Sequence, residues 1–239
     1  MRNPLSKTIE QIKPSGIRKF FDIVSEMPHA ISLGVGEPDF DTPWHVRSEG
    51  IRSLEKGRTF YTSNSGLIEL RQEICKWYQR KYNVLYDYKT EALLTVGGSE
   101  GIDVALRAML DPGDEVIIPE PCYVSYVPCV QLIGAVPVTI ELKNENQFRL
   151  TPEELLAAIT DKTKILILAF PSNPTGAVMT KEDLEPIAKI CQEKDIYVIS
   201  DEIYSELTYG GQKHCSISSL PGMKDRTIVI NGFSKAYAM

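Results

Sequence analysis

Four polar residues of the sequence carry groups that can do covalent and acid–base chemistry. Lys235, Asp201, Tyr204 and Asn173 each stand shortly after an apolar run of strand length. A lysine amine is a nucleophile and a proton carrier, a carboxylate favours a positive charge beside it, and amide and phenol groups donate hydrogen bonds. If the fold brings these residues together, they could hold a ligand covalently and move a proton on it.

The elements that must position these groups alternate between strands and helices. Apolar residues at helical spacing predict amphipathic helices over 67–82 and 100–110. Two further helices are predicted to begin at Thr151 and Thr180, because each hydroxyl is followed three residues later by a carboxylate. Continuous apolar runs predict strands at 92–96, 115–118, 165–170, 196–200 and 227–230.

Strands that alternate with helices in this way predict a fold of the α/β class. Right-handed crossovers would place helices on both faces of a mainly parallel sheet, in a three-layer α/β/α architecture. Ligands of such sheets bind beyond the carboxyl ends of the strands. Gly98, Ser99 and Glu100 stand at such a place, where a helix begins, and backbone N–H groups at a helix N-terminus bind phosphate.

The composition is that of a folded globular protein, and it argues against nucleic acid and membranes as binding partners. Of the 239 residues, 43% are hydrophobic and 24% charged, and the formal net charge is −6. Such a charge gives no positive field for nucleic acid or anionic lipid, and no apolar run approaches the length of a membrane span. The five cysteines include no CxxC pair and the three histidines lie far apart. We therefore expect reduced thiols, no metal site and a cytoplasmic location.

Three segments around the polar residues resemble the signatures of a known family. They read AFPSNPTGAV at 169–178, SDEIY at 200–204 and NGFSKAYAM at 231–239. In this order and spacing they resemble the class I/II pyridoxal-phosphate-dependent aminotransferases, of the aspartate and aromatic kind with fold type I. The resemblance extends over about Ile31–Met239. It implies the large domain of these enzymes, with pyridoxal 5′-phosphate as the cofactor.

The resemblance assigns catalytic roles to Lys235, Asp201 and Tyr204. Lys235 would hold the cofactor aldehyde as a Schiff base and carry a proton between substrate and cofactor. Asp201 would keep the cofactor's ring nitrogen protonated. Tyr204 and Asn173 would hydrogen-bond the ring oxygen, and Asn173 would also contact the substrate; the family often has a cis bond at the matching Asn–Pro step. The alternative interpretations are a surface lysine, a turn aspartate and a turn amide before Pro174.

Other residues match the family's remaining cofactor and substrate contacts. The segment 98–100 and Ser234 would bind the phosphate, and Tyr123 would stack on the cofactor ring. Tyr61 resembles the tyrosine that reaches the phosphate of the neighbouring subunit, which implies a homodimer. Gly36 resembles the loop glycine beside the substrate carboxylate. Taken singly, these residues could equally be ordinary turn, core or interface residues.

The resemblance also predicts how the chain is divided. Residues 1–43 contain five prolines and would form an N-terminal arm and part of a small domain. Residues 44–239 would form the cofactor-binding large domain, incomplete at its C-terminus, with the C-terminal small domain missing. In the family, the arginines that bind the phosphate and the substrate carboxylate follow the cofactor lysine. We therefore expect this polypeptide alone to be a poor transaminase.

The predicted reaction is transamination between an L-amino acid, aromatic, aspartate-like or related, and a 2-oxo acid. One alternative is a pyridoxal-phosphate-dependent carbon–sulfur lyase, since the same lysine and aspartate support elimination. Another is a non-catalytic fragment that binds the cofactor. A regulator fused to a DNA-binding domain is disfavoured, because no basic helix-turn-helix pattern precedes residue 30. Neither nucleic acid nor a membrane is an expected partner.

Overall fold

The computed structural model describes residues 2–12, 16, 23, 26, 27, 29, 31 and 36–239. Much of the predicted arm, including Pro14 and Pro28, lies outside the described residues. The strands are β1 (Glu115–Glu120), β2 (Val136–Glu141), β3 (Thr163–Ala169), β4 (Tyr197–Asp201) and β5 (Thr227–Ile230). The α-helices are α1 (Lys7–Gln11), α3 (Trp44–Glu55), α4 (Ile68–Tyr82), α5 (Gly98–Met109), α6 (Tyr126–Leu132), α7 (Pro152–Ala158), α8 (Lys181–Glu193) and α9 (Phe233–Ala236).

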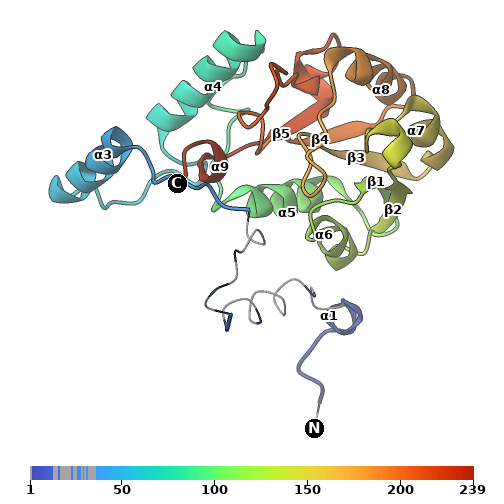
Figure 1. Cartoon of the computed structure of the whole chain (residues 1–239). Coiled ribbons are helices and arrows are strands. Elements are labelled where there is room, and N and C mark those ends of the chain that lie inside the picture. Colours follow the sequence, from blue (N-terminus) through green and yellow to red (C-terminus); the bar gives the residue numbers. More distant parts are fainter. Residues whose placement is uncertain are drawn as a thin grey trace.

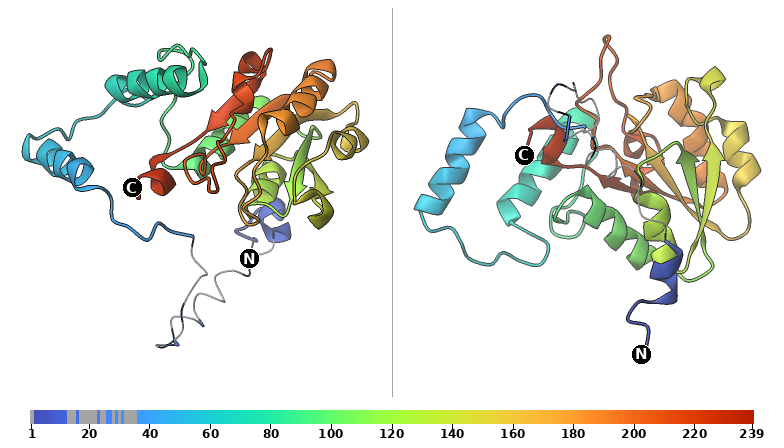
Figure 2. Two further views of the ribbon diagram at one scale, coloured as in Figure 1. Left: turned by 45° about the horizontal axis from the view of Figure 1, so that its top comes forward. Right: turned by 60° about the horizontal axis from the view of Figure 1, so that its bottom comes forward.

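The five strands form a parallel sheet in the order β2-β1-β3-β4-β5. Parallel neighbours require crossover connections, and α6, α7 and α8 provide those from β1 to β4. Helices α5 and α6 pack on one face of the sheet and α7 and α8 on the other (Figures 1 and 2). The predicted three-layer α/β/α architecture is confirmed.

Successive residues of β4 pack into two different cores. Val198 belongs to the core with α7 and α8, whereas Ile199 belongs to the core with α5 and α6. Because successive strand side chains point to opposite faces, Asp201 follows Ile199 toward α6. Glu202 continues the backbone ladder through its N–H to the carbonyl of Ile230 and follows Val198 to the other face. Two adjacent carboxylates are therefore directed into different environments.

Helices α7 and α8 begin where the sequence predicts. The hydroxyl of Thr151 accepts from the N–H of Glu154, and the carboxylate of Glu154 accepts from the N–H of Thr151. Thr180 and Asp183 make the same reciprocal pair at the start of α8. Each pair satisfies backbone donors that the first turn of a helix leaves free.

The predicted strand at 92–96 is wrong. The segment is irregular, and its nearby amide bonds are not those of a sheet: the N–H of Leu94 donates to the carbonyl of Ser65 at 3.1 Å. Val96 is left 92% exposed. A strand requires a neighbouring strand for its backbone hydrogen bonds. In the described part of the chain the edge strand β5 pairs with β4 alone, so the segment 92–96 does not join the sheet beside it. An apolar run cannot supply that partner.

Other helices and strands were not predicted by the sequence pattern, namely α1, α3, α6, α9 and β2. The case of α3 has a clear cause, because the structure describes all of this helix and none of its residues is buried. Its apolar residues Trp44, Ile51 and Leu54 are exposed, and α3 stands apart from the sheet in Figure 1. A helix without a buried face has little of the periodicity that predicts one.

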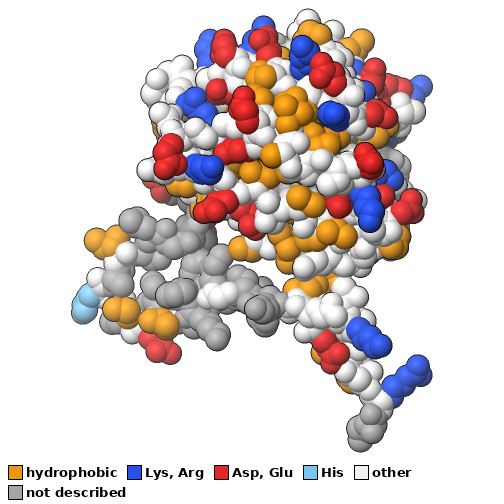
Figure 3. Space-filling model, turned by 90° about the vertical axis from the view of Figure 1, so that its right-hand side faces the viewer, with side chains coloured by type: hydrophobic (Ala, Val, Ile, Leu, Met, Phe, Trp, Pro, Cys, Tyr) orange, Lys and Arg blue, Asp and Glu red, His pale blue; other side chains and the backbone are white. Residues whose placement is uncertain are grey.

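The surface carries charges of both signs. On the face shown in Figure 3, acidic and basic side chains are interspersed, with apolar side chains between them. Among the helices that the structure describes, none has the length and apolar character that crossing a membrane requires. All five cysteines are free thiols in the structure.

Candidate active site

The strand register brings the predicted residues to one edge of the sheet. Ala169 of β3 pairs with Asp201 of β4, and Asp201 pairs with Ile230 of β5. These three strands therefore end level with one another. Asn173, in the loop after β3, and the residues after β4 and β5 leave the sheet at the same edge, which is the place where parallel sheets bind ligands.

Asp201 is a nearly buried carboxylate at the centre of this edge, only 8% exposed. Its Oδ2 accepts a hydrogen bond from the hydroxyl of Tyr126 at 2.7 Å, and its Oδ1 accepts one from the N–H of Ile203 at 3.1 Å. Burial raises the pKa of Asp201, and the charge of Glu202 adds to the effect, while the two hydrogen bonds oppose it. The site thus holds an acid that a neighbouring positive charge would return to its ionised form.

Lys235, Tyr204 and Asn173 lie close to one another beside Asp201. The Nζ of Lys235 lies 5.7 Å from the centroid of the Tyr204 ring and donates to the carbonyl of Gly36. Burial, and then the charge of Asp201, raise the pKa of the Tyr204 hydroxyl, while a hydrogen bond with Asn173 lowers it. Asn173 precedes a cis peptide bond, as the family resemblance led us to expect.

The start of α5 approaches β5 closely because it is built from glycines. Gly97 has φ +86°, a conformation that L side chains rarely adopt. A Cβ on Gly98 or Gly101 would lie 3.4 or 3.3 Å from the side chain of Ile230. The glycines therefore let the N-terminus of a 12-residue helix stand at the edge where β5 ends. The hydroxyl of Ser99 lies 3.4 Å from that of Tyr123 at this place.

Tyr123 and Tyr126 extend the site from α5 to Asp201. Their rings meet edge to face, with centroids 5.6 Å apart. The Tyr123 hydroxyl faces Ser99, and the Tyr126 hydroxyl donates to Asp201. A continuous line of contacts therefore joins the start of α5 to the acid.

Three predicted residues are not drawn into this cluster. Tyr61 is fully exposed, at 105% of the reference area. Ser234 is exposed beside Lys235. The carboxylate of Glu100 accepts from the N–H of Val96, so its side chain closes the loop before α5 rather than facing Asp201.

Two contacting residues were missed by the sequence reasoning, Tyr126 and Asn231. Asn231 donates from Nδ2 to the hydroxyls of Tyr78 and Ser205, both at 3.3 Å, and its Oδ1 accepts from the N–H of Gly232. It thus ties the start of the lysine loop to α4. The available signal was position: Asn231 directly follows β5, and Tyr126 stands three residues after Tyr123.

An open depression on the surface is separate from this cluster. It encloses about 540 Å³ and lies between the end of α4, the start of α8 and the segment 213–219. Arg80, Lys181 and His214 are among its lining residues, and it includes none of the predicted site residues. The strand-edge geometry, rather than this depression, identifies the candidate site.

Comparison with known proteins identifies the family of the chain. The family described as aminotransferase class I and II matches residues 28–239. YugH of Bacillus subtilis (strain 168) is 50% identical over 239 residues, which cover all of this chain and 62% of the relative. Aromatic-amino-acid aminotransferase 2 of Thermococcus litoralis is 46% identical over 235 residues, covering 98% of this chain and 60% of the relative.

A solved structure agrees with the fold. The aspartate aminotransferase of Thermus thermophilus with maleate superposes with a TM-score of 0.93 at 39% identity, and the match covers 100% of this chain and 62% of that one. The chain belongs to the aminotransferase class I and II family. It spans about 60% of the length of the relatives that it matches.

The residues present fit pyridoxal 5′-phosphate, the cofactor of this family. Asp201 is nearly buried, and among the described residues the hydrogen bonds to its carboxylate come from neutral donors, the hydroxyl of Tyr126 and the N–H of Ile203. Lys235 supplies an amine at the same edge, and the glycine-built start of α5 supplies backbone donors for a phosphate. The donor set thus offers an amine, an acid and an anion site.

Proposed function

We propose that this chain forms the cofactor-binding part of a pyridoxal-phosphate-dependent aminotransferase. The protein would transfer an amino group between an L-amino acid and a 2-oxo acid. The observation that carries the proposal is the meeting of Lys235, Asp201 and Tyr204 at the carboxyl edge of β4 and β5. These are the groups that such a reaction requires of the protein.

In this proposal each residue acts on a stated group. Lys235 holds the cofactor through Nζ and moves the proton at the substrate carbon. Asp201 would interact with the ring nitrogen and favour its protonated form. Tyr204 and Asn173 would donate to the ring oxygen, and Asn173 and Gly36 would contact the substrate. When bound, the cofactor supplies an electron sink for the substrate carbon.

The start of α5 is proposed as the phosphate site. The backbone N–H groups of Gly98, Ser99 and Glu100 would face the phosphate, and the hydroxyls of Ser99 and Ser234 would add donors. Tyr123 would lie against the ring, since its hydroxyl is already near Ser99.

We further propose the division of the chain and its assembly. Residues 1–43 would be an arm and part of a small domain, and residues 44–239 the large domain. Tyr61 would contact the phosphate of a second subunit in a homodimer, and its full exposure leaves it free to do so. Five free thiols favour a cytoplasmic location.

The proposed substrates are aromatic, aspartate-like or related amino acids. This range is supported by the relatives, one named for aromatic amino acids and one for aspartate. It is tested by giving the cofactor-loaded protein L-tyrosine or L-aspartate and measuring the matching 2-oxo acid. Release of pyruvate and ammonia from a cysteine conjugate without an oxo-acid acceptor would instead favour the carbon–sulfur lyase.

The proposal is tested by trapping the cofactor on the protein. We expect pyridoxal phosphate followed by borohydride to leave a phosphopyridoxyl group on the peptide that contains Lys235, as peptide mass mapping would show. Lys235→Ala should lose this label. Lys189→Ala is the matched control, because Lys189 lies exposed on α8 in a pair with Glu193. A label elsewhere, or none in the wild type, would contradict the proposal.

A further inference from the structure

We propose that Tyr126 is a positioning residue for the cofactor's ring nitrogen and that it acts through Asp201. The inference rests on the proposed function, in which Asp201 faces that nitrogen. Tyr126 would fix the orientation of the Asp201 carboxylate, so that the carboxylate can accept a hydrogen bond from the protonated ring nitrogen. No segment of the three family signatures contains this tyrosine.

The geometry of Asp201 gives Tyr126 this role. Among the residues that the structure describes, each carboxylate oxygen accepts from one donor: Tyr126 on Oδ2 and the N–H of Ile203 on Oδ1. Ile203 belongs to the same turn as Asp201, so Tyr126 is the contact that reaches the carboxylate from another element, α6. With both oxygens held, the plane of the carboxylate is fixed, and its remaining lone pairs are free for a ligand.

Burial protects the hydrogen bond between Tyr126 and Asp201 from competition by water. Tyr126 is 2% exposed and Asp201 8%, so water does not compete strongly for either group. Burial and the charge of Asp201 raise the pKa of the Tyr126 hydroxyl, which therefore stays protonated at neutral pH. The hydroxyl must then be the donor and the carboxylate the acceptor.

The surroundings of Tyr126 fix its position in turn. It begins α6, and its own N–H donates to the carbonyl of Tyr123 at 3.2 Å. The two rings meet edge to face, and Tyr123 reaches Ser99 at the proposed phosphate site. A shift of α6 would therefore move the contacts to both ends of the ligand together.

A purely structural role for Tyr126 makes a different prediction. Packing would depend on the aromatic ring, which Tyr126→Phe retains, whereas positioning depends on the hydroxyl, which this variant removes. The experiment compares binding of pyridoxal phosphate with that of its 1-deaza analogue, in which a C–H replaces the ring nitrogen. The readout is the ratio of the two dissociation constants, which cancels any general weakening of the site.

We expect Tyr126→Phe to reduce the preference for pyridoxal phosphate roughly tenfold, the loss typical of a hydrogen bond to a charged group. In an Asp201→Asn background the same substitution should change the ratio no further, because its effect passes through Asp201. Tyr86→Phe is the matched control: it removes the hydroxyl of a half-buried tyrosine outside the site and should leave the ratio unchanged.

An unchanged ratio in Tyr126→Phe would overturn the inference, whether both ligands weaken equally or neither does. An equal effect in the Asp201→Asn background would also overturn it. Thermal unfolding checks that the variant folds; should it not, Tyr126→Met, whose flexible side chain fills buried space without a donor group, takes its place in the same comparison. Failure of the wild type to label Lys235 would instead overturn the proposed function itself.

Discussion

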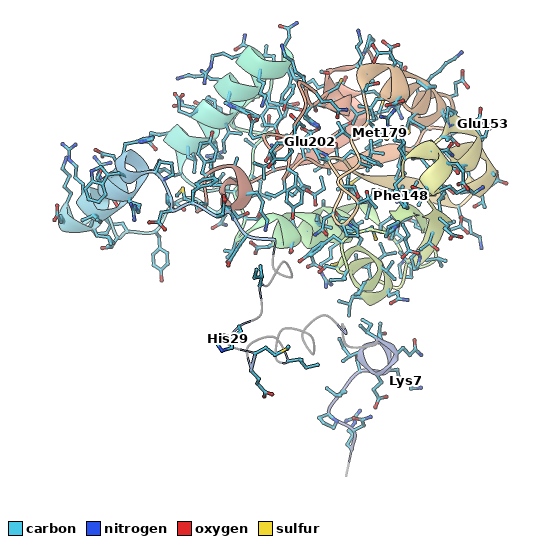
Figure 4. All side chains as sticks on the ribbon, viewed as in Figure 1. Lys7, His29, Phe148, Glu153, Met179 and Glu202 are labelled. Atoms are coloured by element: carbon cyan, nitrogen blue, oxygen red, sulfur yellow. The ribbon has the colours of Figure 1, made fainter. Side chains whose placement is uncertain are left out.

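Asp201 and Glu202 are neighbours in the chain, yet they occupy opposite faces of the sheet and have different surroundings. Asp201 faces α6, where one hydroxyl and one backbone N–H hold it. Glu202 faces the other core and is 0% exposed. It lies between α4 and the sheet, within the body of the protein (Figure 4).

Glu202 is surrounded by partners from the protein itself. The hydroxyls of Ser200 and Ser216 donate to Oε1 at 3.0 and 2.6 Å. Oε2 lies 3.1 Å from Nε2 of His214, and neither atom makes a hydrogen bond to a described residue. The Ser216 hydroxyl also lies 2.8 Å from that of Ser218. These contacts join the end of β4 to the segment 214–218.

The difference separates a binding acid from a structural one. Asp201 lies at the edge of the sheet where ligands bind, whereas the Oε1 of Glu202 accepts from two serine hydroxyls in the interior and its Oε2 lies beside His214. A carboxylate at a strand end can serve a ligand, and one surrounded by protein groups in the interior stabilises the fold. Substitutions at the two positions should therefore affect different measurements.

The largest expected effect is on cofactor binding at Asp201. Asp201→Asn should weaken pyridoxal phosphate binding on the order of a hundredfold, because it removes one partner of a buried charge pair. Spectral titration gives the dissociation constant. Glu202→Gln makes the same change one residue later and should stay within about twofold of the wild type. Equal losses in both variants would erase the proposed distinction.

The next effect is on stability at Glu202. Glu202→Ala should lower the free energy of unfolding by about 3 kcal/mol, because it strands the polar groups around a buried carboxylate. Thermal unfolding should show a fall in Tm on the order of 10 °C. Glu193→Ala, in an exposed pair with Lys189, should change stability by less than about 0.5 kcal/mol. A Glu202→Ala variant as stable as this control would refute the structural role.

A smaller effect is expected at a helix start remote from both carboxylates. Thr180→Ala should cost about 1 kcal/mol, because it removes the hydroxyl that accepts from the N–H of Asp183. Thr180→Ser keeps that oxygen and should lose less. Chemical denaturation measures both, and pyridoxal phosphate binding should be unchanged. A binding defect here would mean that stability, not site geometry, governs the titrations.

The pH dependence of stability should distinguish Asp201 from its amide. Because burial raises the pKa of Asp201 above its ordinary value of 3.8, the ionised carboxylate disfavours folding. The wild type should therefore lose stability relative to Asp201→Asn as pH rises from 3.8 through the raised pKa, with the difference constant above it. Denaturation of both variants without cofactor at several pH values tests this. A wild type that gains stability relative to Asp201→Asn as pH rises would reverse the assigned sign.

The sequence predicts the strands around the site well, and the reasons are local. Runs of β-branched residues mark β3, β4 and β5, and the paired hydroxyl and carboxylate mark the starts of α7 and α8. The residues after those strands, Asp201 and Lys235 among them, could be named before their contacts were known. Parallel pairing alone then places them at one edge.

What the sequence could not provide depends on contacts between distant segments. The segment 92–96 is as apolar as a strand but pairs with none. Tyr126 looks like a core tyrosine until α6 is placed against β4, and only then does its hydroxyl meet Asp201. Glu202 stands inside a recognised signature, yet its partner His214 lies twelve residues along a loop.

The most direct test of the account is the protonation state of the cofactor's ring nitrogen on the protein. Pyridoxal phosphate labelled with ¹⁵N at that atom would be bound to the wild type, Asp201→Asn and Glu202→Gln, and its chemical shift measured by NMR. We predict a protonated nitrogen in the wild type and Glu202→Gln and an unprotonated one in Asp201→Asn. An unprotonated nitrogen in the wild type, or a protonated one in Asp201→Asn, would contradict the role given to Asp201.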